Sequence, residues 1–71
     1  MTITFQHGTY GNGIYYLEIR QDGGSNQYCL ISAQRSKDGT LYGETRTYYG
    51  NMESVQRAYS RKRRQYILQE F

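Results

Sequence analysis

The sequence predicts an α+β domain in which one C-terminal helix packs on one face of an antiparallel meander sheet of four strands, or of three strands plus one. Three observations lead to this prediction. Four stretches rich in β-branched and aromatic residues alternate between polar and apolar side chains, which is typical of strands. Glycine-rich or Asp-Gly segments separate them, as in hairpins. Residues 51–71 instead repeat apolar side chains with a helical period.

The first strand is expected at about residues 2–7, where the alternation predicts that Ile3 and Phe5 are buried. Residues 8–13 contain three glycines and are expected to form a flexible loop, because glycine accepts positive φ angles without strain. This loop lacks the lysine of a phosphate-binding loop and precedes a strand rather than a helix, so we do not expect it to hold a phosphate.

The second strand, at about residues 14–21, has the clearest pattern. One face carries Tyr15, Leu17 and Ile19 and no charge, so this face is expected to meet the helix. The other face is expected to point away from the helix and carries Ile14, Tyr16, Glu18 and Arg20.

The third strand, at about residues 27–35, is expected to be central, because neither of its faces is clearly polar; which face is buried stays open. An Asp-Gly turn then leads to the fourth strand, at about residues 40–49. The face of this strand that is expected to point away from the helix carries Tyr42, Glu44, Arg46 and Tyr48. Cross-strand pairing with arginines is expected to explain Glu18 and Glu44.

The helix is expected at about residues 52–69, with Asn51 as its N-cap. Glu53 lies in the first turn and can pair with Arg57 one turn later. Placed at 100° steps, the apolar side chains form one arc that should pack on the sheet: Met52, Val55, Ala58, Tyr59, Tyr66 and Ile67. The opposite side carries Arg57, Arg61 and Arg64, and the margins of the arc carry Lys62 and Arg63.

Length and composition limit the class of protein. Residues 1–71 are expected to form a single domain. The one cysteine, Cys29, excludes an internal disulfide, and with the one histidine, His7, it is too little for a structural zinc site. We therefore predict no metal and no cofactor. No apolar run is long enough to span a membrane or to act as a signal peptide, so we expect no membrane contact and a cytoplasmic location.

Candidate groups for catalysis are few. His7 is expected at a strand end as a surface residue, and Cys29 as a small buried hydrophobic residue with no neighbour that would activate its thiol. Asp22 and Asp38 occupy turns, where aspartate has a local structural role. We predict no catalytic residue and no enzymatic activity.

Charge is concentrated in one segment. Residues 51–71 carry five basic and two acidic side chains, whereas residues 1–50 carry four of each, so the net charge of +3 belongs to the helix. Two surfaces are therefore candidates for binding. The helix surface comprises Arg57, Arg61, Arg64, Arg63 and Lys62, and the open sheet surface comprises Tyr16, Arg20, Tyr42, Arg46 and Tyr48. The simpler interpretations are a solvated helix and ordinary strand tyrosines.

The stretch Tyr48–Tyr59 resembles the strand–turn–helix of three-stranded-sheet DNA-binding domains, such as phage integrase arm-binding domains and plant ethylene-response-factor domains. The resemblance implies that the exposed sheet face reads the major groove, here with Arg20, Arg35, Arg46 and the tyrosines. The chain departs from this pattern because its strand half is neutral and has few basic residues.

The stretch Gly43–Tyr48, followed by Met52–Val55, is similar to small phage anti-CRISPR proteins, several of which fold as an antiparallel sheet with one or two helices. This resemblance implies inhibition without catalysis, by occupying a surface on a nucleic-acid-handling complex, as a competitor or mimic of nucleic acid. The favoured prediction is therefore a phage-type inhibitor in a bacterial cytoplasm whose partner is a protein, such as a CRISPR effector, with direct nucleic-acid contact possible. The alternatives are a sheet-based DNA-binding module of the integrase arm-binding type and a structural homo-oligomer; monomer and homodimer both stay open.

Overall fold

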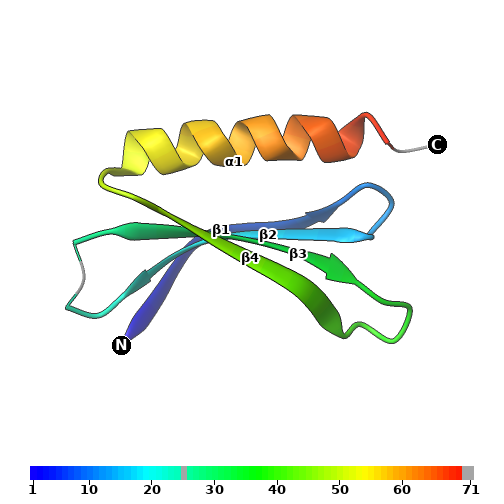
Figure 1. The fold of residues 1–71 in the computed structure, drawn as a ribbon, viewed down its shortest axis with the longest axis horizontal. Helices are drawn as coiled ribbons and strands as arrows, with labels where there is room; N and C mark the ends of the chain where they lie inside the picture. The colour runs from blue at the N-terminus through cyan, green and yellow to red at the C-terminus, as the bar shows by residue number, and fades with distance from the viewer. Residues whose placement is uncertain (25, 70–71) are drawn as a thin grey trace.

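The computed structural model describes residues 1–24 and 26–69. Its described part is one antiparallel four-stranded sheet with the strand order β1-β2-β3-β4, followed by one helix that packs on one face (Figure 1). This arrangement confirms the predicted fold class. The elements are β1 (Thr2–Tyr10), β2 (Tyr15–Asp22), β3 (Tyr28–Arg35), β4 (Leu41–Tyr49) and α1 (Met52–Ile67).

The strand and helix ends differ from the predicted ones mainly at the first loop. β1 continues through Gly8 to Tyr10, because Tyr10 still pairs with Tyr15 of β2. The expected loop of residues 8–13 therefore shortens to a tight connection in which Gly11, Asn12 and Gly13 all have positive φ angles, of 64°, 61° and 84°.

The sheet contains two β-bulges, and both move side chains relative to a regular alternation. In β1, Phe5 is an extra residue between Thr4, which pairs with Arg20, and Gln6, which pairs with Ile19. In β4, Gly43 and Glu44 together lie opposite the single residue Ala33 of β3, and Gly43 takes a φ angle of 63° there.

The core lies between α1 and one face of β2 and β3, and on β2 this is the predicted face with Tyr15, Leu17 and Ile19. Leu17 and Ile19 are fully buried. Val55 and Tyr59 of α1 are at most 1% exposed. Leu30 completes the cluster, which settles that the Tyr28–Leu30–Ser32 side of β3 faces the helix. Burial of each large aliphatic side chain contributes about 1.5–3 kcal/mol, so this cluster supplies much of the stability of so short a chain.

Around this cluster, partly buried side chains seal the layer between α1 and the sheet: Tyr10, Tyr28, Tyr49, Met52, Ala58 and Tyr66. The phenol oxygens of Tyr10 and Tyr59 are 2.7 Å apart, so the polar end of the buried Tyr59 has a hydrogen-bond partner. At the start of α1, the side chain of Asn51 accepts a hydrogen bond from the Ser54 backbone N–H at 2.8 Å. Asn51 is thus the N-cap, as the sequence predicts.

Three predicted core residues are exposed. Ile3 and Phe5 are 46% and 45% exposed, because the N-terminal half of the edge strand β1 runs away from α1 and the bulge displaces Phe5 (Figure 1). Phe5 only contacts the edge of the Tyr28 ring, at a centroid distance of 5.7 Å. Ile67 is 43% exposed, because Tyr66 takes the last position against the sheet by stacking on Tyr15.

The two apolar environments predict a clear contrast in unfolding experiments. Leu17→Ala should lower the free energy of unfolding by about 2–5 kcal/mol, because it leaves a cavity under α1. Ile3→Ala, the control on the exposed strand end, should change it by less than about 1 kcal/mol. Urea denaturation followed by circular dichroism measures both. Equal losses in the two variants would contradict the one-sided core.

Candidate functional site

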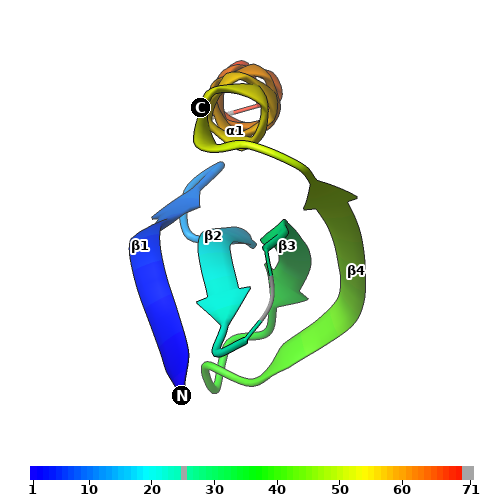
Figure 2. The same ribbon diagram turned by 90° about the vertical axis from the view of Figure 1, so that its left-hand side faces the viewer.

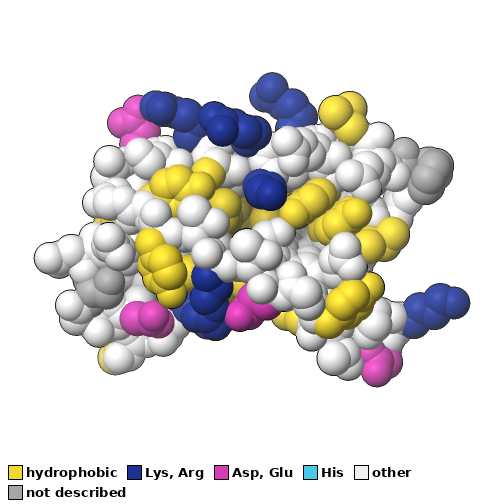
Figure 3. Space-filling view, in the orientation of Figure 1, with side chains coloured by type: hydrophobic (Ala, Val, Ile, Leu, Met, Phe, Trp, Pro, Cys, Tyr) yellow, Lys and Arg dark blue, Asp and Glu magenta, His cyan; other side chains and the backbone are white. Residues whose placement is uncertain are grey.

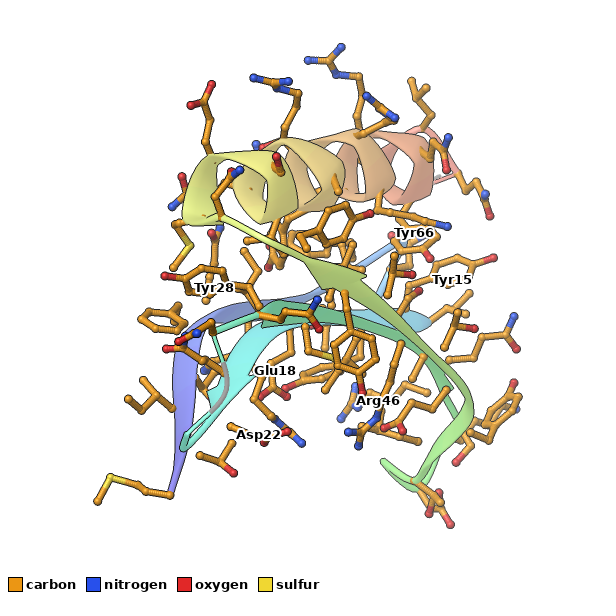
Figure 4. The ribbon with its side chains drawn as sticks, turned by 60° about the vertical axis from the view of Figure 1, so that its left-hand side comes forward. Tyr15, Glu18, Asp22, Tyr28, Arg46 and Tyr66 are labelled. Carbon is orange, nitrogen blue, oxygen red and sulfur yellow. The ribbon has the colours of Figure 1, made fainter. Side chains whose placement is uncertain are left out.

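The face of the sheet opposite α1 is open: Figure 2 looks along α1 and shows it on one side of the sheet, and no other described element covers the opposite side. We call this the open sheet face. Figure 4 shows Glu18, Asp22 and Arg46 on it, whereas Tyr15, Tyr28 and Tyr66 lie on the side of the helix. The register adds cross-strand neighbours to these residues, and the face carries Thr4, His7, Tyr16, Glu18, Arg20, Cys29, Ile31, Ala33, Arg46 and Tyr48.

Glu18 is the centre of this face. Although nothing described lies above the sheet here, Glu18 is only 4% exposed, because its neighbours close over it. Its carboxylate accepts hydrogen bonds from Thr4 Oγ1 at 2.8 Å and from Tyr16 Oη at 2.7 Å. Arg20 donates two more, from Nε at 2.8 Å and from Nη2 at 3.0 Å. This two-pronged arginine contact is the strongest type of ion pair in proteins, and it holds the guanidinium against the carboxylate.

The hydrogen bonds set the charge state of Glu18. Burial by itself would raise the pKa of the Glu18 carboxyl, but the hydrogen bonds from Arg20, Tyr16 and Thr4 outweigh burial and lower its pKa to about 2. Burial and the hydrogen bond to Glu18 raise the pKa of Tyr16 to about 12. At neutral pH the face therefore holds a buried carboxylate, a neutral phenol and a guanidinium whose charge the carboxylate compensates.

A second pair lies on β4, where Arg46 Nε donates to Glu44 Oε2 at 2.9 Å. Both ion pairs join residues two apart on one strand, so the expected cross-strand pairing of Glu18 and Glu44 with arginines is wrong. Side chains at i and i+2 share a face, and the long arginine can fold back along its own strand to reach the acid.

The ion pairs also cover an apolar strip on β3. Cys29, Ile31 and Ala33 point away from α1, yet all three are at most 4% exposed. In the sheet register, Ile31 lies between Glu18 and Arg46, and Cys29 lies between Arg20 and Tyr48. Long side chains thus shield the strip with their apolar stems.

The Cys29 thiol is not set up as a nucleophile. Burial raises its pKa, so the reactive thiolate form is disfavoured at neutral pH. The prediction that Cys29 serves as a small buried hydrophobic residue agrees with this environment.

The predicted position of Tyr42 on the open sheet face is wrong. Because two residues of β4 lie opposite Ala33, Tyr42 pairs with Gln34, which shares the helix-covered face with Tyr15 and Ser32. A one-residue shift moves a strand side chain to the other face. Of the predicted open-face set, the structure therefore brings together Tyr16, Arg20, Arg46 and Tyr48.

The outer side of α1 forms the second candidate surface. Arg57, Arg61 and Arg64 are exposed on it, and we call these three residues the basic row; Figure 3 shows basic side chains gathered along this side of the helix. Arg57 donates to Glu53 at 2.8 Å, as predicted. Within residues 1–24 and 26–69, no carboxylate lies within 4 Å of Arg61 or Arg64. These two guanidiniums are therefore free to meet an external anion.

The basic row borders a shallow hollow of about 240 Å³, lined by Arg57, Arg61, Ala58, Ser54 and Tyr49. Its lining includes two arginines and two hydroxyl-bearing residues, a set that suits a carboxylate or a phosphate oxygen. The other predicted helix residues divide between two sides: Lys62 is exposed near the margin of α1, and Arg63 is half-buried close to Tyr59.

Other kinds of site find little support in the described residues. No group of three His, Cys, Asp or Glu side chains comes close enough to hold a metal ion in the described part of the chain. No described helix is long and apolar enough to cross a membrane. The His7 ring lies 6.5 Å from the Tyr16 ring, on the open sheet face next to Glu18 in the register.

Comparison with known proteins finds no match to this chain among protein-family profiles, curated proteins or solved structures. The functional argument therefore depends on the sequence and geometry of the chain itself. The sequence reasoning missed the burial of Glu18. A usable signal was present in the strand itself, because Glu18 stands between Tyr16 and Arg20 at i−2 and i+2, and both can reach one carboxylate on the same face.

The Glu18 network predicts a pH dependence of stability. The folded-state pKa of about 2 lies below the ordinary value of 4.5, so the network stabilises the fold above pH 4.5, and this contribution is lost as the pH falls toward 2. Glu18→Gln should therefore be less stable than wild type by up to about 3 kcal/mol at pH 7, and the difference should shrink as the pH approaches 2.

Glu44→Gln is the matched control, because it removes an exposed carboxylate that is also paired with an arginine two residues on. It should cost less than about 1 kcal/mol at pH 7. Thermal unfolding from pH 7 to pH 2.5 measures both variants. A Glu18→Gln difference that stays constant across this range would contradict the depressed pKa.

Proposed function

We propose that this chain is a small non-enzymatic inhibitor that docks the outer side of α1 on a nucleic-acid-handling protein complex and blocks the complex by occupying its surface. The observation that carries the proposal is the basic row, in which Arg61 and Arg64 are exposed and have no carboxylate within ion-pair distance among the described residues. Arginine is the side chain most enriched, with Tyr and Trp, at the energetic centres of protein interfaces.

An acidic protein surface fits the basic row better than a long path of DNA phosphates. The row runs over eight residues of helix, about 10 Å along the axis, which is enough for a cluster of two or three carboxylates. On the open sheet face, Glu18 and Glu44 already bind the guanidiniums of Arg20 and Arg46, so neither guanidinium is left unmatched for a phosphate backbone. This charge balance argues against the alternative of a sheet that reads the major groove.

The choice of a CRISPR effector as the partner rests on the resemblance of Gly43–Tyr48 and Met52–Val55 to small phage anti-CRISPR proteins. These segments lie on β4 and in the first turn of α1, next to the basic row. Effectors of this kind hold nucleic acid in charged channels, and an inhibitor that occupies a surface beside such a channel needs no reactive group. The place of action would be the cytoplasm of a bacterial host.

The proposal predicts inhibition of at least one effector in a panel of purified guide-loaded CRISPR effectors, read out as loss of target-DNA binding or cleavage. Arg61→Ala/Arg64→Ala should weaken this inhibition by at least about tenfold, because it removes the two unpaired guanidiniums. The matched control is Arg35→Ala/Lys37→Ala, which also removes two exposed positive charges, from the end of β3 and the turn that follows it, and should inhibit like wild type.

Two outcomes would contradict this proposal: no effector in the panel is bound or inhibited, or both double variants inhibit equally well. Direct binding of duplex DNA with a steep loss of affinity between low and physiological salt would instead favour the DNA-binding alternative. A sedimentation mass of one chain would contradict the structural homo-oligomer, which would need an exposed edge of β1 or β4 to pair with a second copy.

A further inference from the structure

A second hollow lies farther along the helix, between the C-terminal half of α1 and strand β4, which lie one above the other in Figure 1. We call it the helix–β4 groove. It has a volume of about 230 Å³ and is independent of the basic row. The side chains that matter for the argument are Tyr15, Ser32, Thr45, Thr47, Lys62 and Tyr66.

The groove exists because α1 covers β2 and β3 but leaves part of β4 uncovered. Thr45 and Thr47 pair with Ser32 and Leu30, so they lie on the helix side of the sheet, yet both are exposed. Gly43 extends the opening, since a Cβ atom at this position would meet nothing within 4 Å. The bulge at Gly43 thus keeps one end of the groove free of side chains.

One wall of the groove is held rigidly. The Tyr66 ring stacks on Tyr15 with a centroid distance of 4.1 Å and an interplanar angle of 4°. The Tyr66 hydroxyl lies 2.6 Å from Ser32 Oγ on the floor, and Tyr15 Oη donates to Gln69 Oε1 at 3.0 Å. Both ends of the stacked pair are therefore fixed, and the wall needs no rearrangement to receive a ligand.

The polar groups in the groove suit an anion. Lys62 is the one charged side chain that lines it, and no carboxylate of the described residues lies within 4 Å of its ammonium group. The hydroxyls of Thr45 and Thr47 make no side-chain hydrogen bond within residues 1–24 and 26–69. An ammonium group, two unengaged hydroxyls and the Ser32–Tyr66 hydroxyl pair therefore surround one small space.

We propose that the helix–β4 groove binds a small phosphate ester, with its phosphate on Lys62, Thr45 and Thr47 and its organic part against the Tyr66 side of the stacked pair. A lysine with several hydroxyls suits a phosphate, because the ammonium group acts as a point charge and each hydroxyl can donate to a separate oxygen. A planar carboxylate is instead matched best by an arginine fork, and no arginine lines this groove. The volume restricts the ligand to a small molecule.

The test is a titration of the isotope-labelled full chain, followed by ¹H–¹⁵N correlation spectra, with ribose 5-phosphate, inorganic phosphate and acetate as probes. Ribose 5-phosphate should give saturable shifts at residues 43–47 and 62–66 and should bind more tightly than inorganic phosphate. Acetate should bind more weakly than both.

Variants separate the groove from general charge effects. Lys62→Gln should weaken binding of ribose 5-phosphate by about tenfold, and Thr47→Val, which removes one hydroxyl at nearly constant shape, by several-fold. Lys37→Gln, which removes the other lysine, from the β3–β4 turn and outside the lining of the groove, should bind like wild type. Arg61→Ala/Arg64→Ala should also bind like wild type, so the groove is testable whether or not the basic row serves an inhibitor.

Several results would overturn the proposal. Shifts confined to the outer side of α1, or an equal affinity of wild type and Lys62→Gln, would mean that the groove holds no phosphate. Equal affinities for ribose 5-phosphate and inorganic phosphate would contradict the part of the proposal that concerns the ester, and acetate binding as tight as phosphate binding would contradict the ligand class.

Discussion

Packing of α1 against one face of the sheet is the interaction on which the rest of this structure depends. A chain of 71 residues with one cysteine has no disulfide to hold it, so the contact of Val55 and Tyr59 with Leu17, Ile19 and Leu30 must supply most of the burial. This contact determines which side of the helix is inside. It therefore directs the side with Arg57, Arg61 and Arg64 into solvent, where Arg61 and Arg64 have no carboxylate within ion-pair distance among the described residues.

The opposite face of the sheet also carries apolar side chains that need shielding from water, but no described element covers it. The side chains of the face itself provide the cover. Arg20, Tyr16 and Thr4 close over Glu18. Together with Arg46 and Tyr48, they shield Ile31 and Cys29. A consequence follows for function. The arginines of this face are matched by carboxylates, so the face is locally neutral, whereas the helix keeps unmatched charge. The two candidate surfaces are thus electrostatically unequal, although both contain arginines and tyrosines.

Features that depend on local periodicity could be predicted from the sequence. They include the fold class, the buried Leu17–Ile19 face of β2, the Asn51 cap and the division of α1 into an apolar and a basic side. Features that depend on the partner strand could not. The bulges that displace Phe5 and Tyr42 are set by pairing with β2 and β3, and the burial of Glu18 needs Thr4 from a neighbouring strand. The helix–β4 groove could not be predicted from the sequence either, because it depends on how α1 is placed over the sheet and arises where α1 leaves part of β4 uncovered.

The most direct test of this account is the solvent exchange of arginine side-chain N–H groups, measured by NMR on the folded protein. The account holds that the sheet arginines are engaged internally and the end of the basic row is free. The Nε–H proton of Arg20, which donates to buried Glu18 at 2.8 Å, should therefore exchange much more slowly than those of Arg61 and Arg64. Equal and fast exchange at all three arginines would contradict the central claim that the open sheet face satisfies its own charges.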